Sequence, residues 1–294
     1  MDGILLIKKE QNFTSFDVVA KLRGILKTRK IGHTGTLDPM ATGLLVTLIG
    51  NATPLCDILP DDKKVYRAAF KLGIKTDTED IWGNITEEKD TSVSEQQLRE
   101  ALPHFTGEIM QIPPMYSAIK IGGKKLCDLA REGREIERTP RPVKIDSIEL
   151  LSYDESLREG SMVIECRKGT YIRTLIKDIG DFLGSGAAMT ALERLNSNGF
   201  SIEHAYTLEE VEDLAKDGSI DTKLIPAYDA FKEFEDIEAG EWQARMIENG
   251  VKLKREKMGN PKDGYYRIWH KGKFLCACRY VKDEPNLKMI FKGK

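Results

Sequence analysis

The sequence predicts a mixed fold of helices and strands, built as one large domain followed by a small one. Its 294 residues are enough to bury a full core, and 40% hydrophobic with 31% charged residues is the composition of an ordinary soluble globular protein. Some segments carry apolar residues at helical spacing, whereas others alternate apolar with polar residues. The composition shifts near 234–240, and short predicted strands follow. We therefore expect a large domain over 1–234 and a small, β-rich domain over 238–294.

The N-terminal elements follow from their patterns. Residues 3–7 predict a strand, and Thr14 then caps a helix that carries a single apolar stripe. The apolar run at 44–49 predicts a buried strand. Residues 65–72 alternate in polarity, which predicts a strand with Tyr66 on its apolar face.

The later elements are bounded by caps and terminating glycines. Further helices are expected at 94–105, 170–183, 207–217 and 242–249. Further strands are expected at 143–151, 162–166, 265–269, 274–281 and 287–291. Between them, 106–142 is basic and rich in Gly and Pro, with little periodicity, so we assign it no regular structure.

Composition narrows the class of protein. No apolar run approaches the ~20 residues that span a bilayer, and the N-terminus has no basic lead before its short apolar run, so we expect neither a membrane span nor a signal peptide. The cysteines are odd in number, scattered and without zinc spacing. We interpret them as reduced, buried thiols of a cytosolic protein, with redox or metal roles as the alternative. They are Cys56, Cys127, Cys166, Cys276 and Cys278.

The charge is distributed unevenly. A net charge of −2 argues weakly against a nucleic-acid-binding protein. However, 8–33 carries seven Lys and Arg against two acids, 251–294 carries thirteen against four, and 201–241 carries three against thirteen. Basic surfaces at both ends suit local phosphate binding, and a solvated charge mosaic is the alternative.

The most informative segment is 32–43, which reads Gly-His-Thr-Gly-Thr-Leu-Asp-Pro-Met-Ala-Thr-Gly. Gly and Pro favour a tight, exposed backbone that approaches a ligand closely. One carboxylate, Asp38, lies in this loop directly before the buried strand at 44–49. A lone acid on a rigid loop suits a nucleophile or a general base, and a plain Asp-Pro turn is the alternative.

This segment resembles the catalytic motif of the bacterial tRNA pseudouridine synthase B (TruB) family. Four further blocks extend the resemblance over nearly the whole chain: 3–15, 64–83, 105–143 and 166–180. They include Lys-x-Tyr-Arg, Leu-Gly-x-x-Thr-Asp-Thr-x-Asp, Gln-x-Pro-Pro-Met-Tyr-Ser-Ala-Ile-Lys and Lys-Gly-Thr-Tyr-Ile-Arg-Thr-Leu. The resemblance implies an α+β fold in which a mixed, largely antiparallel sheet with flanking helices forms the catalytic domain. It also implies an insertion at about 106–142 that covers the RNA, and a small β-rich, PUA-like C-terminal domain.

The resemblance implies that the protein is an isomerase. It would convert uridine 55 in the T loop of tRNA to pseudouridine after flipping the base out of its stack, with no cofactor and no metal. Asp38 would be the nucleophile, and Arg173 would pair with it and keep it ionised. Tyr66 would lie against the flipped base and handle the C5 proton, although it also suits a core position. Attack at C6, attack at C1′ and an elimination route remain open.

Further residues are implied to bind the RNA. His33 matches the family histidine that stacks where the uridine left. Phosphate or substrate contacts are expected from Lys9, Thr36, Lys64, Arg67, Lys120 and Tyr171, although each lysine alone also suits an ordinary surface charge. The partner is the T arm of tRNA, and we expect a cytoplasmic monomer that needs no protein partner and no membrane.

The chain departs from the family pattern in three places, one of which is Cys127, where an aromatic residue is common in the insertion. The family commonly has Lys-Pro-x-Gly where this chain has Lys9 followed by Glu-Gln-Asn at 10–12, which leaves the local loop shape open. After Leu192 the family commonly has two arginines, whereas this chain has Glu193 and Arg194, which removes basic contacts.

Two other functions could also use an aspartate in such a loop or bind tRNA. An aspartyl-phosphate phosphotransferase also uses a loop aspartate, but it needs a second acid two residues later to hold Mg²⁺, and Met40 occupies that position. A tRNA-binding or folding chaperone with secondary catalysis is the other alternative, and no residue of this chain excludes it.

Overall fold

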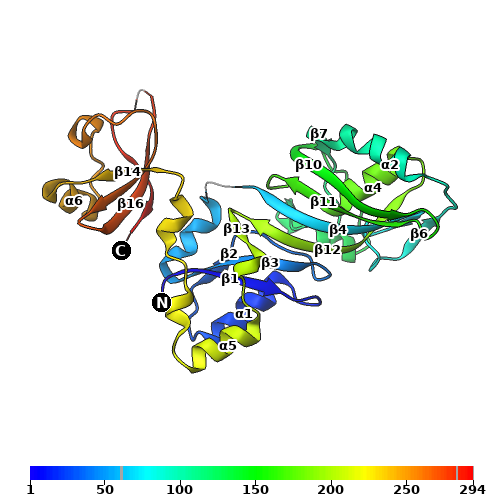
Figure 1. The fold of residues 1–294 in the computed structure, drawn as a ribbon, viewed down its shortest axis with the longest axis horizontal. Helices are drawn as coiled ribbons and strands as arrows, with labels where there is room; N and C mark the ends of the chain where they lie inside the picture. Colours follow the sequence, from blue (N-terminus) through cyan, green and yellow to red (C-terminus); the bar gives the residue numbers. More distant parts are fainter. Residues whose placement is uncertain (60–61, 283, 294) are drawn as a thin grey trace.

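A nine-stranded sheet forms the larger part of the molecule, and a separate four-stranded sheet lies at one end of it (Figure 1). The computed structural model describes residues 1–59, 62–282 and 284–293. The main sheet has the order β1-β3-β12-β4-β11-β10-β7, with β2 beside β3 and β13 beside β12. Within it, β12 runs parallel to β3, and the other pairs are antiparallel. The predicted α+β fold with a mixed, largely antiparallel sheet is confirmed.

The strands of the main sheet include every one predicted in this part of the chain. They are β1 (Gly3–Lys9), β2 (Ile31–His33), β3 (Thr42–Ile49), β4 (Lys64–Leu72), β7 (Gly107–Gln111), β10 (Arg141–Asp154), β11 (Glu159–Cys166), β12 (Ala187–Ser197) and β13 (Phe200–Ser201). Two hairpins stand apart from this sheet. They are formed by β5 (Ile74–Thr76) with β6 (Ile85–Glu88), and by β8 (Lys120–Ile121) with β9 (Lys124–Lys125).

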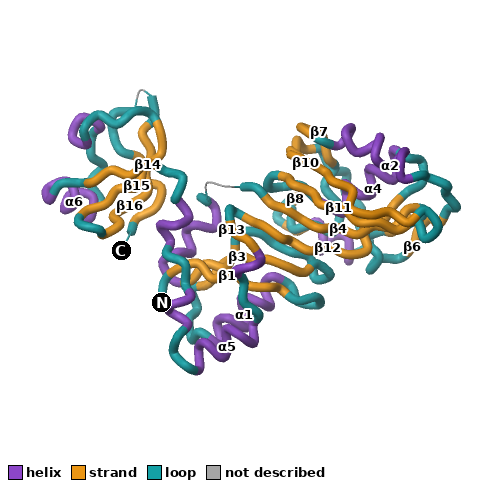
Figure 2. Tube along the Cα trace, viewed as in Figure 1, coloured by secondary structure: helices purple, strands orange, loops and turns teal. Residues whose placement is uncertain are grey.

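Helices cover the main sheet in two groups (Figure 2). The α-helices are α1 (Ser15–Ile25), α2 (Glu95–Ala101), α3 (Leu126–Arg131), α4 (Ile172–Phe182), α5 (Leu208–Lys216) and α6 (Glu241–Glu248). Short 3₁₀ helices are η1 (Gly50–Asp57), η2 (Leu102–Phe105), η3 (Ile202–His204), η4 (Ile220–Lys223), η5 (Ala227–Phe231) and η6 (Arg255–Met258). α1 and α5 pack together below β1 and β3, and α4 packs against β12 and β4. No helix in the described residues is both long and apolar enough to cross a bilayer.

The capping signals locate the helix starts well. The Thr14 side chain accepts from the backbone N–H of Asp17 and forms a capping box at α1, and Ser94 forms another with Gln97 at α2. α2 gives way to a 3₁₀ turn at Pro103, because proline cannot donate within a helix. α4 begins at Ile172, two residues later than predicted.

The C-terminal sheet consists of β14 (Glu235–Glu238), β15 (Gly264–His270), β16 (Lys273–Tyr280) and β17 (Lys288–Lys292). It confirms the small β-rich domain. Its Phe274 and Phe291 belong to the same apolar cluster as Phe231 and the β1 residues Ile4 and Leu6, so the two sheets share a hydrophobic contact.

Several strands were not predicted, among them β2, β5, β6, β13 and β14, and two further regions differ more strongly. β12 was not predicted, yet it occupies the sheet between β3 and β4. The segment 106–142, to which no regular structure was assigned, contributes β7 to the main sheet through pairing with β10, and also holds α3 and the β8–β9 hairpin.

Candidate active site

The loop that carries Asp38 connects β2 to β3 and is fixed at both ends. β2 pairs with β3 before the chain leaves the sheet, and the Thr34 N–H still donates to the Val46 carbonyl at 3.1 Å. Further along, the Leu37 N–H donates to Ser15 Oγ at the start of α1, at 2.8 Å. Leu37 itself is buried in the core, whereas the Asp38 side chain is 38% exposed. A rigid loop thus presents a carboxylate that a ligand can reach.

Arg173 lies in the first turn of α4 and faces Asp38. Its Nε is 3.0 Å from Asp38 Oδ2, and the Arg173 side chain is only 5% exposed. Nη1 donates to the Thr78 carbonyl at 2.8 Å, and Nη2 donates to the Tyr116 carbonyl at 2.9 Å. Because each nitrogen has an acceptor, the guanidinium is held in one orientation and fixes the Asp38 carboxylate beside it.

A second carboxylate, Asp80, completes this cluster, and the sequence analysis gave it no role. Its Oδ2 is 3.7 Å from Arg173 Nη1. Its Oδ1 accepts from the Thr78 hydroxyl at 2.8 Å and from the Trp82 N–H at 3.0 Å. Asp80 is buried. It is the last aspartate of the Thr-Asp-Thr-x-Asp block at 76–80, so the available signal was that motif.

A cavity of about 230 Å³ opens beside this cluster. Six of the predicted site residues line it: Thr36, Asp38, Lys64, Tyr66, Tyr171 and Arg173. They come from the β2–β3 loop, from β4 and from the start of α4. The fold therefore brings together residues separated by more than a hundred positions.

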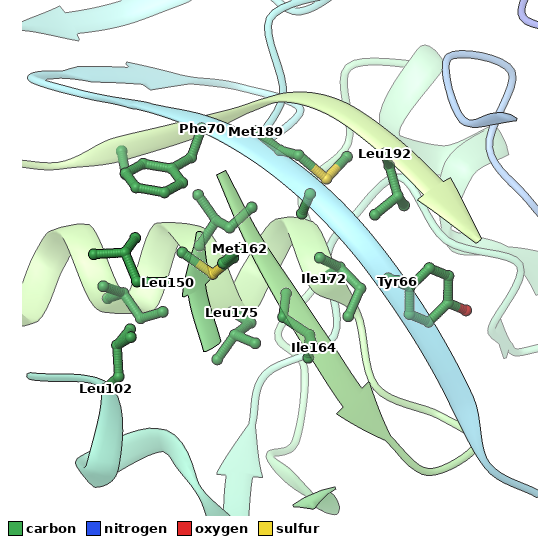
Figure 3. Packing of buried hydrophobic residues seen from close by; sticks show 14 of the residues in the cluster. Tyr66, Phe70, Leu102, Leu150, Met162, Ile164, Ile172, Leu175, Met189 and Leu192 are labelled. Carbon is green, nitrogen blue, oxygen red and sulfur yellow. The ribbon is translucent and has the colours of Figure 1, made fainter. Parts of the chain in front are cut away.

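Tyr66 forms part of the cavity wall and part of the core. Its ring packs at the end of the apolar cluster, and its hydroxyl points away from the other labelled side chains (Figure 3). Burial raises the pKa of the Tyr66 hydroxyl. Burial also raises the pKa of Tyr171, whose backbone N–H donates to Gln111 Oε1 at 2.8 Å. Both hydroxyls are protonated at neutral pH.

The other predicted contacts lie outside the cavity wall. Lys9 is buried, and its ammonium donates to the carbonyls of Glu10 at 2.9 Å and Phe13 at 2.6 Å. Arg67 is exposed and lies 3.3 Å from Glu193. Lys120 is exposed on β8. Lys9 thus holds its own turn together in this structure, and its contact with RNA remains a prediction.

His33 lies on β2, one residue before the loop. It is partly buried, and its Nδ1 has no hydrogen-bond partner among the described residues. Burial, followed by the nearby Arg194 guanidinium, lowers the pKa of His33. A neutral ring with a spare nitrogen remains available for stacking, as the resemblance implies.

Arg194 is the second residue that the sequence analysis missed. It lies on β12, opposite Tyr66 in the β12–β4 ladder, and is fully buried. Its Nε donates to the Leu44 carbonyl at 2.7 Å, and its Nη2 donates to the Gly35 carbonyl at 3.0 Å. The expectation that this segment only loses basic contacts was incomplete, because Arg194 braces the Asp38 loop from below.

The shape of the turn at 10–12, where the chain departs from the family pattern, is defined in the structure. Asn12 adopts a φ of 70°, and its N–H donates to the Pro39 carbonyl at 2.9 Å. Asparagine tolerates this left-handed conformation better than most residues do, so it serves where the family commonly has glycine. The turn therefore still supports the Asp38 loop.

The described residues contain no group of three or more His, Cys, Asp or Glu side chains placed to hold a metal ion. The chemistry available at the cavity is that of a carboxylate paired with a buried arginine, beside two protonated tyrosines. This set supports attack by, or proton transfer to, a carboxylate.

Comparison with known proteins gives a consistent result. The model of the TruB family pseudouridylate synthase N-terminal domain matches residues 23–172, and that of the tRNA pseudouridylate synthase B C-terminal domain matches 173–231. The chain is 42% identical to tRNA pseudouridine synthase B of Clostridium tetani, over 96% of this chain and 97% of that protein. It is 43% identical to the Bacillus pumilus protein of the same name, over 86% of this chain and 84% of that protein.

A solved structure shares the fold. A chain of a Cbf5–Nop10–Gar1 complex superimposes with a TM-score of 0.75 at 24% identity, covering 99% of this chain and 84% of that chain. Together with the two family models and the full-length relatives, the arrangement around Asp38 leads to one conclusion. The chain belongs to the TruB family of tRNA pseudouridine synthases, which are isomerases.

Proposed function

We propose that this protein converts uridine 55 in the T loop of tRNA to pseudouridine, without a cofactor and with Asp38 as the nucleophile. The observation that carries this proposal is the 3.0 Å contact between Asp38 and the buried Arg173 at the wall of a cavity that is large enough for one nucleobase. The reaction breaks the N1–C1′ bond and joins C5 to C1′, so atoms are rearranged with no net redox change. One well-placed carboxylate can serve such a reaction.

The roles follow from the positions of the side chains. Arg173 holds the Asp38 carboxylate in place at the cavity wall. Tyr66 lies against the base, and because burial keeps its hydroxyl protonated, it must pass its own proton on before it accepts the one from C5. The base has to leave its stack to enter the cavity, and His33 is proposed to fill the space that it leaves.

The substrate and the cellular setting are part of the same proposal. The relatives are named for their action on tRNA, and the basic segments 8–33 and 251–294 suit the phosphates of a tRNA T arm. We propose that the protein acts as a cytoplasmic monomer. The domain limits of 1–234 and 238–294 also remain a proposal.

Incubation with unmodified tRNA tests this function. Chemical probing should detect pseudouridine at position 55 with the natural protein and none with Asp38→Asn. The reaction should proceed in excess chelator, whereas a Mg²⁺-dependent phosphotransferase would stop. Absence of pseudouridine with the natural protein, or its persistence in Asp38→Asn, would refute the proposal.

A further inference from the structure

Two cations near the cavity lack an anionic partner. Among the described residues, the Lys64 ammonium has no hydrogen-bond or ion-pair partner, and Arg194 Nη1 is buried without a hydrogen-bond partner. Asp62 is the carboxylate with the strongest influence on Lys64, and it lies 2.9 Å from Arg167. Buried positive charge without compensation is costly, so such a pair favours an incoming anion.

Gly35 lies beside both cations. A Cβ built on Gly35 would lie 3.3 Å from Lys64 Nζ and 3.5 Å from Arg194 Nη1, so both nitrogens approach the side of the backbone that only a glycine leaves uncovered. The Gly35 carbonyl already accepts from Arg194 Nη2 on another side. Two positive charges therefore meet at one point of the Asp38 loop, and Lys64 also lines the cavity.

We propose that Lys64 and Arg194, with the open face of Gly35 beside them, form a binding site for one phosphodiester of the RNA strand next to the flipped uridine. This inference rests on the proposed function, because it takes the ligand to be RNA. When the base enters the cavity, its backbone stays at the opening, where the Lys64 ammonium can meet a phosphate oxygen. Arg194 fixes the loop and adds positive charge from beneath.

The charge state of Lys64 supports this placement. Burial, and then the Arg194 guanidinium, lowers the pKa of Lys64 to about 8. The charged and titratable groups that face it are Arg194 on β12, Cys166 on β11, Lys168 in the following turn and Asp62 before β4. A bound phosphate raises this pKa, because an adjacent negative charge favours the ammonium. Affinity should therefore be steady below pH 8 and fall as the pH rises above it.

A coupling experiment tests the site directly. The probe is an RNA hairpin with the T-loop sequence, in which single linkages around the target uridine are replaced by neutral methylphosphonates. Binding is measured in the Asp38→Asn background to prevent turnover. We expect Lys64→Gln to weaken binding of the normal hairpin about tenfold. One particular neutral linkage should weaken hairpin binding by a similar factor in the protein that retains Lys64. The same linkage should not weaken binding further in the protein that carries Lys64→Gln.

Three further variants make the test specific. Lys71→Gln removes a positive charge from the same strand, where Lys71 lies 2.7 Å from Glu159, and should show no such coupling. Lys64→Arg should retain affinity and lose the decline above pH 8. Gly35→Ala would press a methyl group against the flexible end of Lys64 without requiring a left-handed backbone, so it should fold normally, displace the ammonium and weaken binding in the same coupled way.

The outcomes separate this inference from the proposed function. If the effects of Lys64→Gln and of every neutral linkage within two nucleotides simply multiply, Lys64 does not contact a phosphate and the inference is wrong. A contact to a uracil carbonyl would give that same result. If coupling is found but the natural protein forms no pseudouridine in tRNA, the anion site stands and the proposed function fails.

Discussion

The two buried arginines beside the cavity differ in how their charge is balanced. Arg173 contacts the carboxylates of Asp38 and Asp80, and each of its nitrogens has an acceptor. Arg194 donates only to backbone carbonyls of the described residues and keeps one nitrogen unpaired. The first arrangement stabilises a negative charge that the protein supplies, and the second leaves room for a negative charge that the ligand supplies. The Arg173 side therefore suits chemistry, and the Arg194 side suits binding.

After Asp38→Asn, Tyr66→Phe should have the largest effect on the chemical side. We expect the single-turnover rate at saturating tRNA to fall about 10³-fold, because the ring still packs but no hydroxyl remains to move a proton. Tyr153→Phe is a matched control, since the Tyr153 hydroxyl donates to the Val93 carbonyl at 3.1 Å, far from the cavity wall. If Tyr66→Phe reacts as fast as the natural protein, the role of Tyr66 is limited to packing.

Arg173→Lys should slow the reaction by about 10²-fold although the charge is kept. A single ammonium cannot contact Asp38 and also donate to the carbonyls of Thr78 and Tyr116, so Asp38 loses its fixed orientation. Arg158→Lys, at an arginine that lies 3.1 Å from Asp90 on the surface, provides the control. Equal rates for the two variants would mean that the geometry of Arg173 is unimportant.

Arg194→Met tests the other arginine through stability. Loss of its two donors leaves the Leu44 and Gly35 carbonyls unpaired, while removal of a buried charge offsets part of that cost. We expect a net loss of about 1–3 kcal/mol in the free energy of unfolding, measured by urea denaturation. A variant as stable as the natural protein would show that Arg194 does not brace the loop.

The smallest effect is expected from charges far from the cavity. Changing the exposed Lys252 and Lys257 to Gln should make the salt dependence of tRNA binding shallower by roughly one unit per lost contact.

Deletion of 236–294 should weaken binding more than it slows single-turnover chemistry. This truncation also uncovers Phe231, whose ring lies 5.8 Å from that of Phe291, so it needs a cooperative melt as a control. If the dependence of tRNA affinity on salt concentration is the same in these variants as in the natural protein, the C-terminal charges do not contact the RNA.

Much of the fold was predictable because its signals are local. Caps at Thr14 and Ser94 and the alternation at 65–72 located elements to within a few residues. β12 was missed because Ala, Leu, Glu and Arg favour helices intrinsically, and the strand is specified instead by its pairing with β3 and β4. Arg194 received no role for the same reason, since its burial depends on that pairing.

The site was predictable where a motif carried it. Asp38, Tyr66 and Arg173 were named from sequence blocks, and the structure places all three at one cavity. Asp80 lay in such a block too, but nothing local reveals that it lies 3.7 Å from a residue on α4. Lys9 shows another limit, because a sequence displays a charge without showing whether that charge is buried.

The most direct test compares Asp38→Asn with Lys64→Gln in single-turnover reactions over a range of tRNA concentrations. Asp38→Asn should lose the rate at saturation almost completely while its tRNA affinity stays within about tenfold, since phosphate contacts supply most of the binding. Lys64→Gln should lose affinity by a larger factor than rate. A loss of rate in one variant and a loss of affinity in the other would show that one side of the cavity carries the chemistry and the other side binds the RNA. If Asp38→Asn instead keeps more than a few per cent of the natural rate, or if both variants lose rate and affinity in equal proportion, the account is contradicted.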